Sequence, residues 1–150
     1  MIRSAPGCLF ALLAIISLAA CSPPLPEEKR IAQSIVKMQQ AADKRDLADV
    51  MQHIHPSFLG KKNMRKRQLQ GHFYFHFQIN PRIRVYISNL NIVVEGEDAE
   101  VSCHLLVTGS HTKIPDWGQL YRIRSGWKKF GKDWQVVEAE WEDVVEELQQ

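Results

Sequence analysis

The apolar residues of this chain change their spacing once, near residue 80, and that change limits the folds available to it. Before this point apolar positions recur every three or four residues, as on one face of a helix, whereas after it they alternate, as in a strand with one buried face. Helices followed by strands predict an α+β domain with an antiparallel sheet. The sequence contains no internal repeat, so a solenoid is not expected.

The first two expected helices lie before residue 56. The first spans residues 27–45, because Pro26 and the acidic residues after it suit a helix start. Asp46 is the expected N-cap of a second, short helix that ends at His55–Pro56. The expected buried positions of the two helices are Ile31, Ile35, Met38, Ala42, Leu47, Val50, Met51 and Ile54.

A third helix is expected within residues 63–78, where Leu69, Phe73 and Phe77 are spaced by four. The run Phe73–Phe75 could also begin a strand, so this segment has two interpretations.

About four strands are expected after residue 80. The first alternates from Ile83, and a parity slip at Ser88–Asn89 predicts a β-bulge. Residues 95–98 form a polar turn. The other strands are expected at residues 99–107, 120–130 and 134–141, with a turn at 131–133.

Residues 1–20 differ from the rest of the chain. Arg3 is their only charge, and residues 8–20 are apolar or small, which is typical of a secretory signal and too short for an ordinary transmembrane helix. The end of the segment, Leu18-Ala19-Ala20-Cys21, resembles the lipobox of bacterial lipoproteins. The resemblance implies cleavage before Cys21 and acylation of its thiol, by palmitate or a similar chain. An ordinary signal peptide with a cysteine at this place is the alternative.

The residues after Cys21 refine the expected location. Ser22 rather than Asp follows it, which in the enterobacterial lipoproteins that it resembles favours the outer membrane. We therefore expect a lipid-anchored protein of the bacterial cell envelope that faces the periplasm. The proline-rich linker, residues 21–26, reaches at most about 20 Å from the bilayer.

Cysteine use agrees with this expectation. Cys8 would leave with the signal and Cys21 would carry lipid, so that Cys103 alone would remain and no intramolecular disulfide is expected. Cys103 lies in an alternating strand and is interpreted as a small buried apolar residue, with a catalytic thiol as the alternative.

The order of elements resembles the nuclear transport factor 2-like superfamily. The resemblance rests on the order of a helix, a short helix capped by Asp46, a third helix and a meander of strands. It also rests on the ending Gly131-Lys132-Asp133-Trp134 through Trp141. It covers residues 27–143. It implies N-terminal helices packed in the concavity of a curved sheet, a cone with a pocket. The expected division is a signal peptide (1–20), a lipidated Cys21 with its linker (21–26), the domain (27–143) and an acidic tail (144–150).

Members of this superfamily include isomerases, dehydratases, polyketide cyclases and non-catalytic binding domains, so the fold does not choose a function. Isomerase chemistry needs a buried carboxylate with a raised pKa and an oxyanion donor. No Asp or Glu occurs from Val50 to Val94, and Tyr86 and Tyr121 are expected to place their hydroxyls at the surface.

Three residues are the weak catalytic candidates: His72, His76 and Asp116. The two histidines share a helix face, but no third ligand is evident, so we expect neither a metal site nor a cofactor.

Charge is distributed unevenly along the chain. The net charge of +2 gives no reason to expect nucleic acid. The membrane-surface candidate is a basic run, interpreted alternatively as a solvated loop, that consists of Lys61, Lys62, Arg65, Lys66 and Arg67. From Asp133 onward there are seven acidic residues and no basic ones.

On the outward sheet face, opposite charges share parity and are expected to pair across strands: Arg122 and Arg124 with Glu138 and Glu140. This face is the expected surface for a homodimer or an envelope protein partner.

Together these features predict a lipid-anchored, non-catalytic envelope domain that binds a small apolar ligand or a protein partner. A small-molecule isomerase, dehydratase or cyclase and an assembly component of an envelope complex are the alternatives.

Overall fold

The computed structural model of the chain describes residues 23–144, so the expected signal peptide, Cys21 and residues 145–150 of the acidic tail lie outside the described residues. None of the helices within residues 23–144 is long and apolar enough to span a membrane. The elements are α1 (Glu27–Asp43), α2 (Leu47–Met51), β1 (Ile54–Gly60), the 3-10 turn η1 (Lys61–Asn63), β2 (Met64–Arg65), α3 (Lys66–Ile79), β3 (Arg82–Glu95), β4 (Asp98–Ser110), β5 (Trp117–Phe130) and β6 (Asp133–Asp143).

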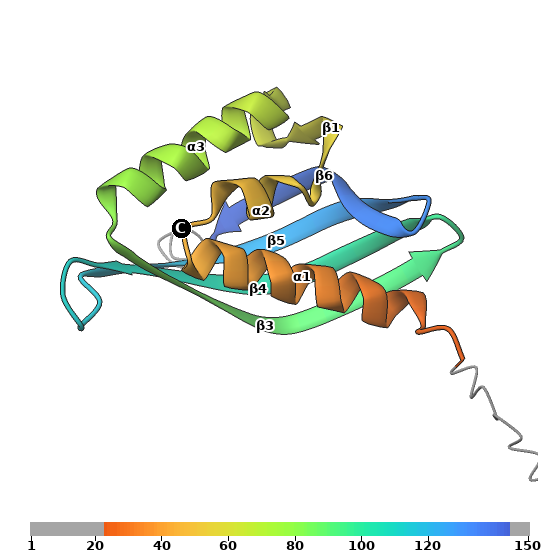
Figure 1. Cartoon of the computed structure of the whole chain (residues 1–150), viewed down its shortest axis with the longest axis horizontal. Coiled ribbons are helices and arrows are strands. Elements are labelled where there is room, and N and C mark those ends of the chain that lie inside the picture. Colours follow the sequence, from red (N-terminus) through yellow and green to blue (C-terminus); the bar gives the residue numbers. More distant parts are fainter. Residues whose placement is uncertain (1–22, 145–150) are drawn as a thin grey trace, which may run out of the picture.

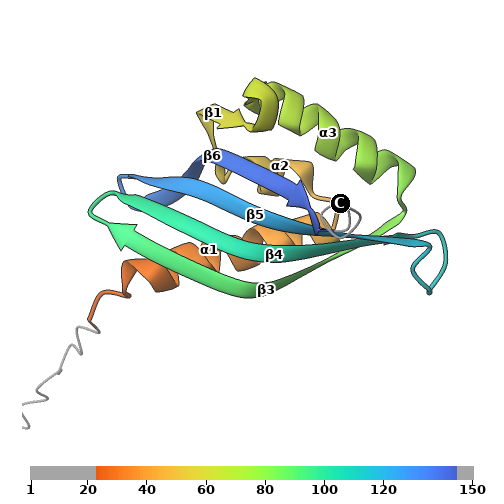
Figure 2. The ribbon, with the colours of Figure 1, turned by 180° about the vertical axis from the view of Figure 1, so that it is seen from behind.

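A curved sheet carries the helices on one face (Figure 1). Its strand order is β2-β1-β6-β5-β4-β3, with β1 and β6 parallel and every other pair antiparallel. From behind, β3 to β6 have no helix in front of them (Figure 2). The expected α+β class, with helices against a curved sheet, is therefore confirmed, although the sheet is mixed and has six strands rather than about four.

All three expected helices are present, although α1 ends at Asp43 rather than at residue 45. Asp46 caps α2 as expected, because its Oδ1 accepts a hydrogen bond from the Asp49 amide at 3.0 Å. The helix ends at Met51 rather than at His55–Pro56, and the chain continues as β1. This strand escaped prediction because Pro56 has no amide hydrogen and the β1–β6 register is interrupted around it, between Ile54 and Leu59.

The third helix is confirmed over Lys66–Ile79, so the strand interpretation of Phe73–Phe75 is wrong. The predicted bulge is also present, because the β3–β4 register shifts between Ser88 and Asn91. Asn89 adopts a left-handed conformation there, with φ 51°.

The core lies between α1 and the inner face of the sheet. Ile31 and Ile35 of α1 are buried against residues of the sheet and of β1, which are Phe58, Ala99, Val101, Trp127, Trp134 and Val136. A second cluster joins Phe77 of α3 to Ala41, Val50, Ile83 and Val85. Burying an aliphatic or aromatic side chain of this size stabilises a fold by about 1.5–3 kcal/mol.

α1 also covers the edge of the sheet. Asp43 accepts a hydrogen bond from the Val85 amide at 2.8 Å, and Gln39 donates one to the Val85 carbonyl at 2.7 Å. Side chains of the helix thus replace the missing neighbour of β3 at this residue, which protects an edge that could otherwise pair with another chain.

The Glu27 side chain holds the start of α1 against the turn between β5 and β6. Its carboxylate accepts hydrogen bonds from Lys129 Nζ at 2.8 Å and from Trp134 Nε1 at 2.6 Å, and Arg30 lies 3.5 Å away. The hydrogen bond from Lys129, followed by the one from Trp134, lowers the pKa of Glu27 below its ordinary value of 4.5.

This contact predicts a pH dependence of stability. Because the folded pKa of Glu27 is lower than the unfolded one, its stabilisation is present above about pH 4.5 and is lost as the pH falls through the folded value. Glu27→Gln should lower the melting temperature at pH 7 and weaken its decline between pH 5 and pH 3. Thermal unfolding followed by circular dichroism measures both, with the exposed neighbour Glu28→Gln as control. An unchanged pH profile in Glu27→Gln would contradict this role.

Candidate functional site

The histidine candidates lie on the solvent side of α3. Leu69, Phe73 and Phe77 turn toward the core, which leaves His72 and His76 exposed. The His76 ring packs edge-on against Phe75, with centroids 5.7 Å apart. Within residues 23–144 no group of three or more His, Cys, Asp or Glu side chains could hold a metal ion.

Asp116 lies in the loop between β4 and β5, and its side chain links the two ends of this loop. Its Oδ2 accepts hydrogen bonds from the His111 amide at 2.7 Å and pairs with His111 Nδ1 at 2.9 Å. The hydrogen bonds from His111 lower the pKa of Asp116. In the described part of the chain, no hydrogen bond or ion pair joins Asp116 to His72 or His76.

The concave face holds a polar group around Tyr121, a residue whose hydroxyl was expected at the surface, together with Gln119 and Asp143, which the sequence did not single out. Tyr121 on β5 stands opposite Asp143 on β6, and Gln119 donates a hydrogen bond to Asp143. Tyr121 stands opposite Leu105, whose side chain faces inward, so the side chain of Tyr121 is half-buried on the inner face of the sheet. Burial, and then the charge of Asp143, raises the pKa of Tyr121, so that its phenol stays protonated and can donate.

The apolar strand face that surrounds this group is as expected. Ala99 and Val101 are buried, and Leu105 and Val107 pack against the second core cluster. Cys103 is half-buried and free, and burial raises the pKa of its thiol, which disfavours the thiolate that a nucleophile needs.

The outer face of the sheet carries an uncovered apolar stripe. Tyr86, Leu106 and Leu120 stand opposite one another on β3, β4 and β5. Tyr86 is 54% exposed and Leu106 is 38% exposed. Tyr86 therefore lies at the surface as expected, and neighbouring strands align its ring with two leucines.

The charged residues of the predicted partner face lie beside this stripe, with different partners. Arg122 pairs with Glu142 at 3.7 Å, and Arg124 pairs with Glu100 at 3.4 Å. Arg124 stands directly opposite Glu140 across β5 and β6, as expected, although its ion pair is with Glu100 on β4. Arg122 stands opposite Glu142 rather than Glu138 or Glu140. For Arg122 the cause is the register, because a shift between Gly126 and Trp127 places it opposite Glu142.

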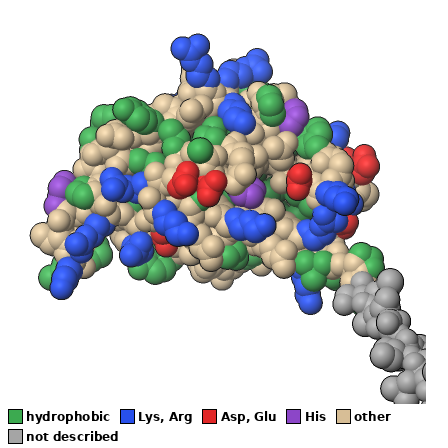
Figure 3. Space-filling view, in the orientation of Figure 1, with side chains coloured by type: hydrophobic (Ala, Val, Ile, Leu, Met, Phe, Trp, Pro, Cys, Tyr) green, Lys and Arg blue, Asp and Glu red, His purple; other side chains and the backbone are tan. Residues whose placement is uncertain are grey.

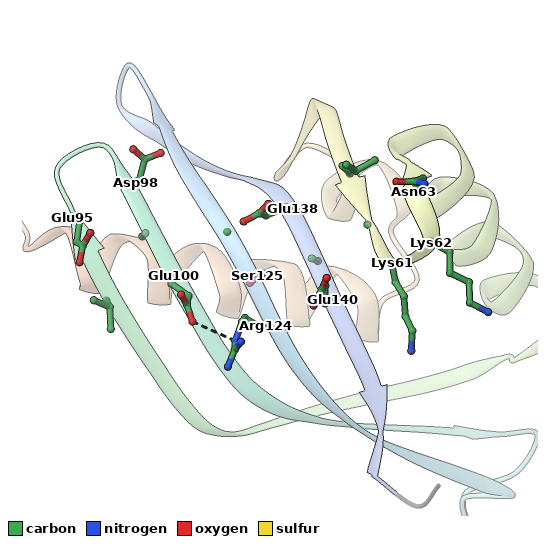
Figure 4. Close-up of a pocket in the computed structure, with 16 residues that line it drawn as sticks. Lys61, Lys62, Asn63, Glu95, Asp98, Glu100, Arg124, Ser125, Glu138 and Glu140 are labelled. Carbon is green, nitrogen blue, oxygen red and sulfur yellow. Dashed lines mark ion pairs between the residues drawn. The ribbon is translucent and has the colours of Figure 1, made fainter. Parts of the chain in front are cut away.

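A groove of about 770 Å³ crosses this face between η1 and the β3–β4 hairpin (Figure 4). Gly126 forms part of its floor, and the Glu138 side chain lies so close that a Cβ on Gly126 would stand 2.6 Å from it. The charged residues that line the groove are Lys61, Lys62, Glu95, Asp98, Glu100, Arg124, Glu138 and Glu140. The sheet thus contributes five carboxylates and Arg124 to the groove, and η1 contributes two lysines at its rim.

The basic run surrounds η1 and the start of α3. Lys61 donates a hydrogen bond to the Trp141 carbonyl at 2.9 Å, and Lys66 donates one to the Ile54 carbonyl at 2.5 Å. Lys62 has φ 56°, a left-handed conformation. Lys and Arg side chains project from the upper edge of the molecule in Figure 3, the edge along which α3 begins in Figure 1.

Comparison with known proteins establishes the fold. No protein-family profile matches the chain, and no curated protein matches it by sequence. Among solved structures, Bd1075 of Bdellovibrio bacteriovorus matches with a TM-score of 0.68 and 14% identity over 77% of this chain, which spans only 41% of that protein.

Two further structures match along nearly their whole length. A Nostoc punctiforme protein of unknown function with a cystatin-like fold has a TM-score of 0.62 and 16% identity, covering 77% of this chain and 90% of that one. A Streptomyces avermitilis protein of the nuclear transport factor 2-like family, described as a candidate dehydratase, has a TM-score of 0.68 and 10% identity, covering 79% and 97%. The chain therefore has the nuclear transport factor 2-like, cystatin-like fold. Identities this low show the fold alone.

Proposed function

We propose that this chain is a lipid-anchored protein of the bacterial cell envelope whose domain binds a protein partner, without catalysis, through the outer face of its sheet. The carrying observation is the uncovered outer face, where the stripe of Tyr86, Leu106 and Leu120 adjoins a charged groove. Exposed apolar patches rimmed by charges are typical of protein-binding sites. The partner is a second copy or another envelope protein.

The alternative is a small-molecule isomerase, dehydratase or cyclase on the concave face. Tyr121, Gln119 and Asp143 are the observation that favours it, since a protonated phenol beside a carboxylate suits proton transfer. The same apolar face would suit a small apolar ligand without turnover. Turnover lost in both Tyr121→Phe and Asp143→Asn would support the enzyme and contradict a non-catalytic role.

The basic run has weaker support as a membrane contact of the anchored protein. The described chain begins at the lower edge of the molecule in Figures 1 and 2, whereas α3 begins at the upper edge. A linker that reaches at most about 20 Å would hold the lower edge near the bilayer. The outer sheet face therefore remains the preferred binding surface.

A single substitution in the apolar stripe tests the partner face. Leu106→Lys should weaken self-association or partner capture at least tenfold, because a charge would be buried between Tyr86 and Leu120 without a counter-ion. The melting temperature should change little, since this side chain is 38% exposed. Analytical ultracentrifugation and affinity capture from envelope extracts measure the effect.

The matched control is Val36→Lys on α1, where the side chain is 46% exposed and away from the outer face. Equal binding by wild type and Leu106→Lys would contradict the proposed surface. Arg122→Glu combined with Arg124→Glu is a second variant of the same face, and it should also weaken binding.

The anchor has its own test. Cys21→Ser should abolish acylation and leave an uncleaved precursor or a periplasmic form, because several acyl chains together provide the membrane affinity. Intact mass and membrane fractionation measure this, and Cys8→Ser should leave acylation intact. Lipid on the Cys21→Ser protein would contradict the lipobox interpretation.

A further inference from the structure

The loop between β4 and β5, residues 111–116, presents a large apolar side chain to solvent. Ile114 is 74% exposed, more than any other large apolar residue within residues 23–144. It belongs to neither core cluster, and Pro115 beside it is exposed as well. Single exposed apolar residues are common on protein surfaces, so the surroundings of Ile114 decide whether it has a role.

The backbone around Ile114 is satisfied within the loop. The Ile114 amide donates a hydrogen bond to Thr112 Oγ1 at 3.3 Å, and the Thr112 hydroxyl donates one to the Ile114 carbonyl at 3.3 Å. Pro115 has no amide hydrogen, and the Asp116 amide donates to the Gly109 carbonyl at 2.9 Å. Peptide groups can enter apolar surroundings only when such partners are already in place, because burying an unpaired one is costly. The tip of this loop meets that requirement.

Further hydrogen bonds hold the loop in one position. Ser110 Oγ and an Arg82 guanidinium nitrogen both donate to the Thr112 carbonyl, at 2.8 Å and 3.2 Å. At its other end, Trp117 Nε1 donates to Asn80 Oδ1, just after α3, at 2.9 Å. The loop is therefore a braced projection, and little conformational entropy would be lost when its tip makes a contact.

Cationic side chains surround the apolar tip. Lys113 and Arg82 are exposed, and within residues 23–144 neither forms an ion pair with a carboxylate. The carboxylate of the loop, Asp116, is occupied by His111. At the end of the molecule that carries this loop, Figure 3 shows hydrophobic, Lys or Arg, and His side chains but no acidic one. An apolar tip with a cationic rim is complementary to the interface of a bilayer with anionic lipids.

The loop lies on the same edge of the molecule as the start of the described chain. It hangs from the lower edge in both views, at the opposite end from the residues that lead into α1 (Figures 1 and 2). The expected linker would hold this lower edge near the bilayer. The loop would then face the same membrane surface as the anchor.

We infer that the β4–β5 loop is a second membrane contact, in which Ile114 enters the headgroup region of the bilayer and Lys113 and Arg82 lie against anionic lipid phosphates. The inference rests on the proposed lipid anchor. One apolar side chain and two cations bind a membrane weakly by themselves, but the anchor gives the loop a high effective concentration at the surface. The contact fixes the long axis of the domain along the bilayer and leaves the outer sheet face free for a partner.

Methyl nuclear magnetic resonance of the lipidated full-length mature chain in nanodiscs tests the contact with native side chains as probes. The nanodiscs contain phosphatidylglycerol and a phospholipid with a nitroxide on its headgroup, and the isoleucine δ1 methyl groups are labelled. The Ile114 signal, assigned with Ile114→Val, should lose more than half of its intensity. Ile79, which is 47% exposed at the end of α3, is the matched control and should keep most of its intensity.

The failure of the anchor and the failure of the loop contact give different results. Intact mass shows whether the chain carries lipid, and a chain without lipid would overturn the anchor and the loop contact together. A lipidated chain whose Ile114 signal stays as intense as that of Ile79 would overturn the loop contact alone. An Ile114 signal that keeps its intensity, but shifts as the number of copies in each nanodisc rises, would assign the loop to a contact between proteins.

The cationic rim is tested by a charge change. Lys113→Gln should weaken the intensity loss of Ile114 in the phosphatidylglycerol nanodiscs, because one attraction to the lipid phosphates is removed. The control, Lys62→Gln at η1, makes the same change in charge on the upper edge and should leave the intensity loss unchanged. Equal effects of the two variants would show that net charge, rather than this loop, sets the contact, and would overturn the role of Lys113.

Discussion

Burial of one face of a long sheet against α1 is the constraint on which the rest of the structure depends. Ile31 and Ile35 fill the space over Val101, Trp127 and Trp134, while Asp43 and Gln39 close the sheet edge at Val85. The described helices therefore all lie on the inner side of the sheet. The outer face of β3 to β6 is left without cover, and its composition decides what the domain can bind.

Two kinds of surface follow from this arrangement. The inner face is mostly apolar, with Ser125 buried in it beside Trp127, and Tyr121, Gln119 and Asp143 lie together at the start of β5 and the end of β6. The outer face carries both an apolar stripe and a groove with charges of both signs. An apolar stripe exposed to water is costly for a protein that acts alone, and this cost favours the outer face as a binding surface.

The sequence predicts much of the fold because periodicity reports which side of an element is buried. The spacing of Phe73 and Phe77, the Asp46 cap and the parity slip at Ser88–Asn89 are all local patterns, and each is confirmed. Strand β1 was not predictable in this way, since it contains a proline and pairs with β6, which lies about 80 residues away along the chain. The sheet therefore gains two strands that no local pattern indicates.

The candidate site was predictable only in part. Parity placed Arg122 and Arg124 on the outer face, but it does not give their partners. Arg122 meets Glu142 because of a register shift, and Arg124 pairs with Glu100 on β4 although it stands opposite Glu140 on β6. The apolar stripe and the pair of Tyr121 and Asp143 could not be predicted from local sequence either, because their residues lie on different strands and are brought together by the strand register. His72 and His76 are four residues apart and therefore share one face of α3, as predicted. Both side chains are exposed, because the opposite face of α3 packs on the core.

The central claim is that the outer sheet face is the surface that binds a protein, and site-specific photo-cross-linking in intact cells tests it most directly. A photoreactive residue replacing Leu106 should form a covalent adduct with a protein or with a second copy of the chain, whereas the same residue replacing Val36 on α1 should form none. Adducts from position 36 together with none from position 106 would contradict the account.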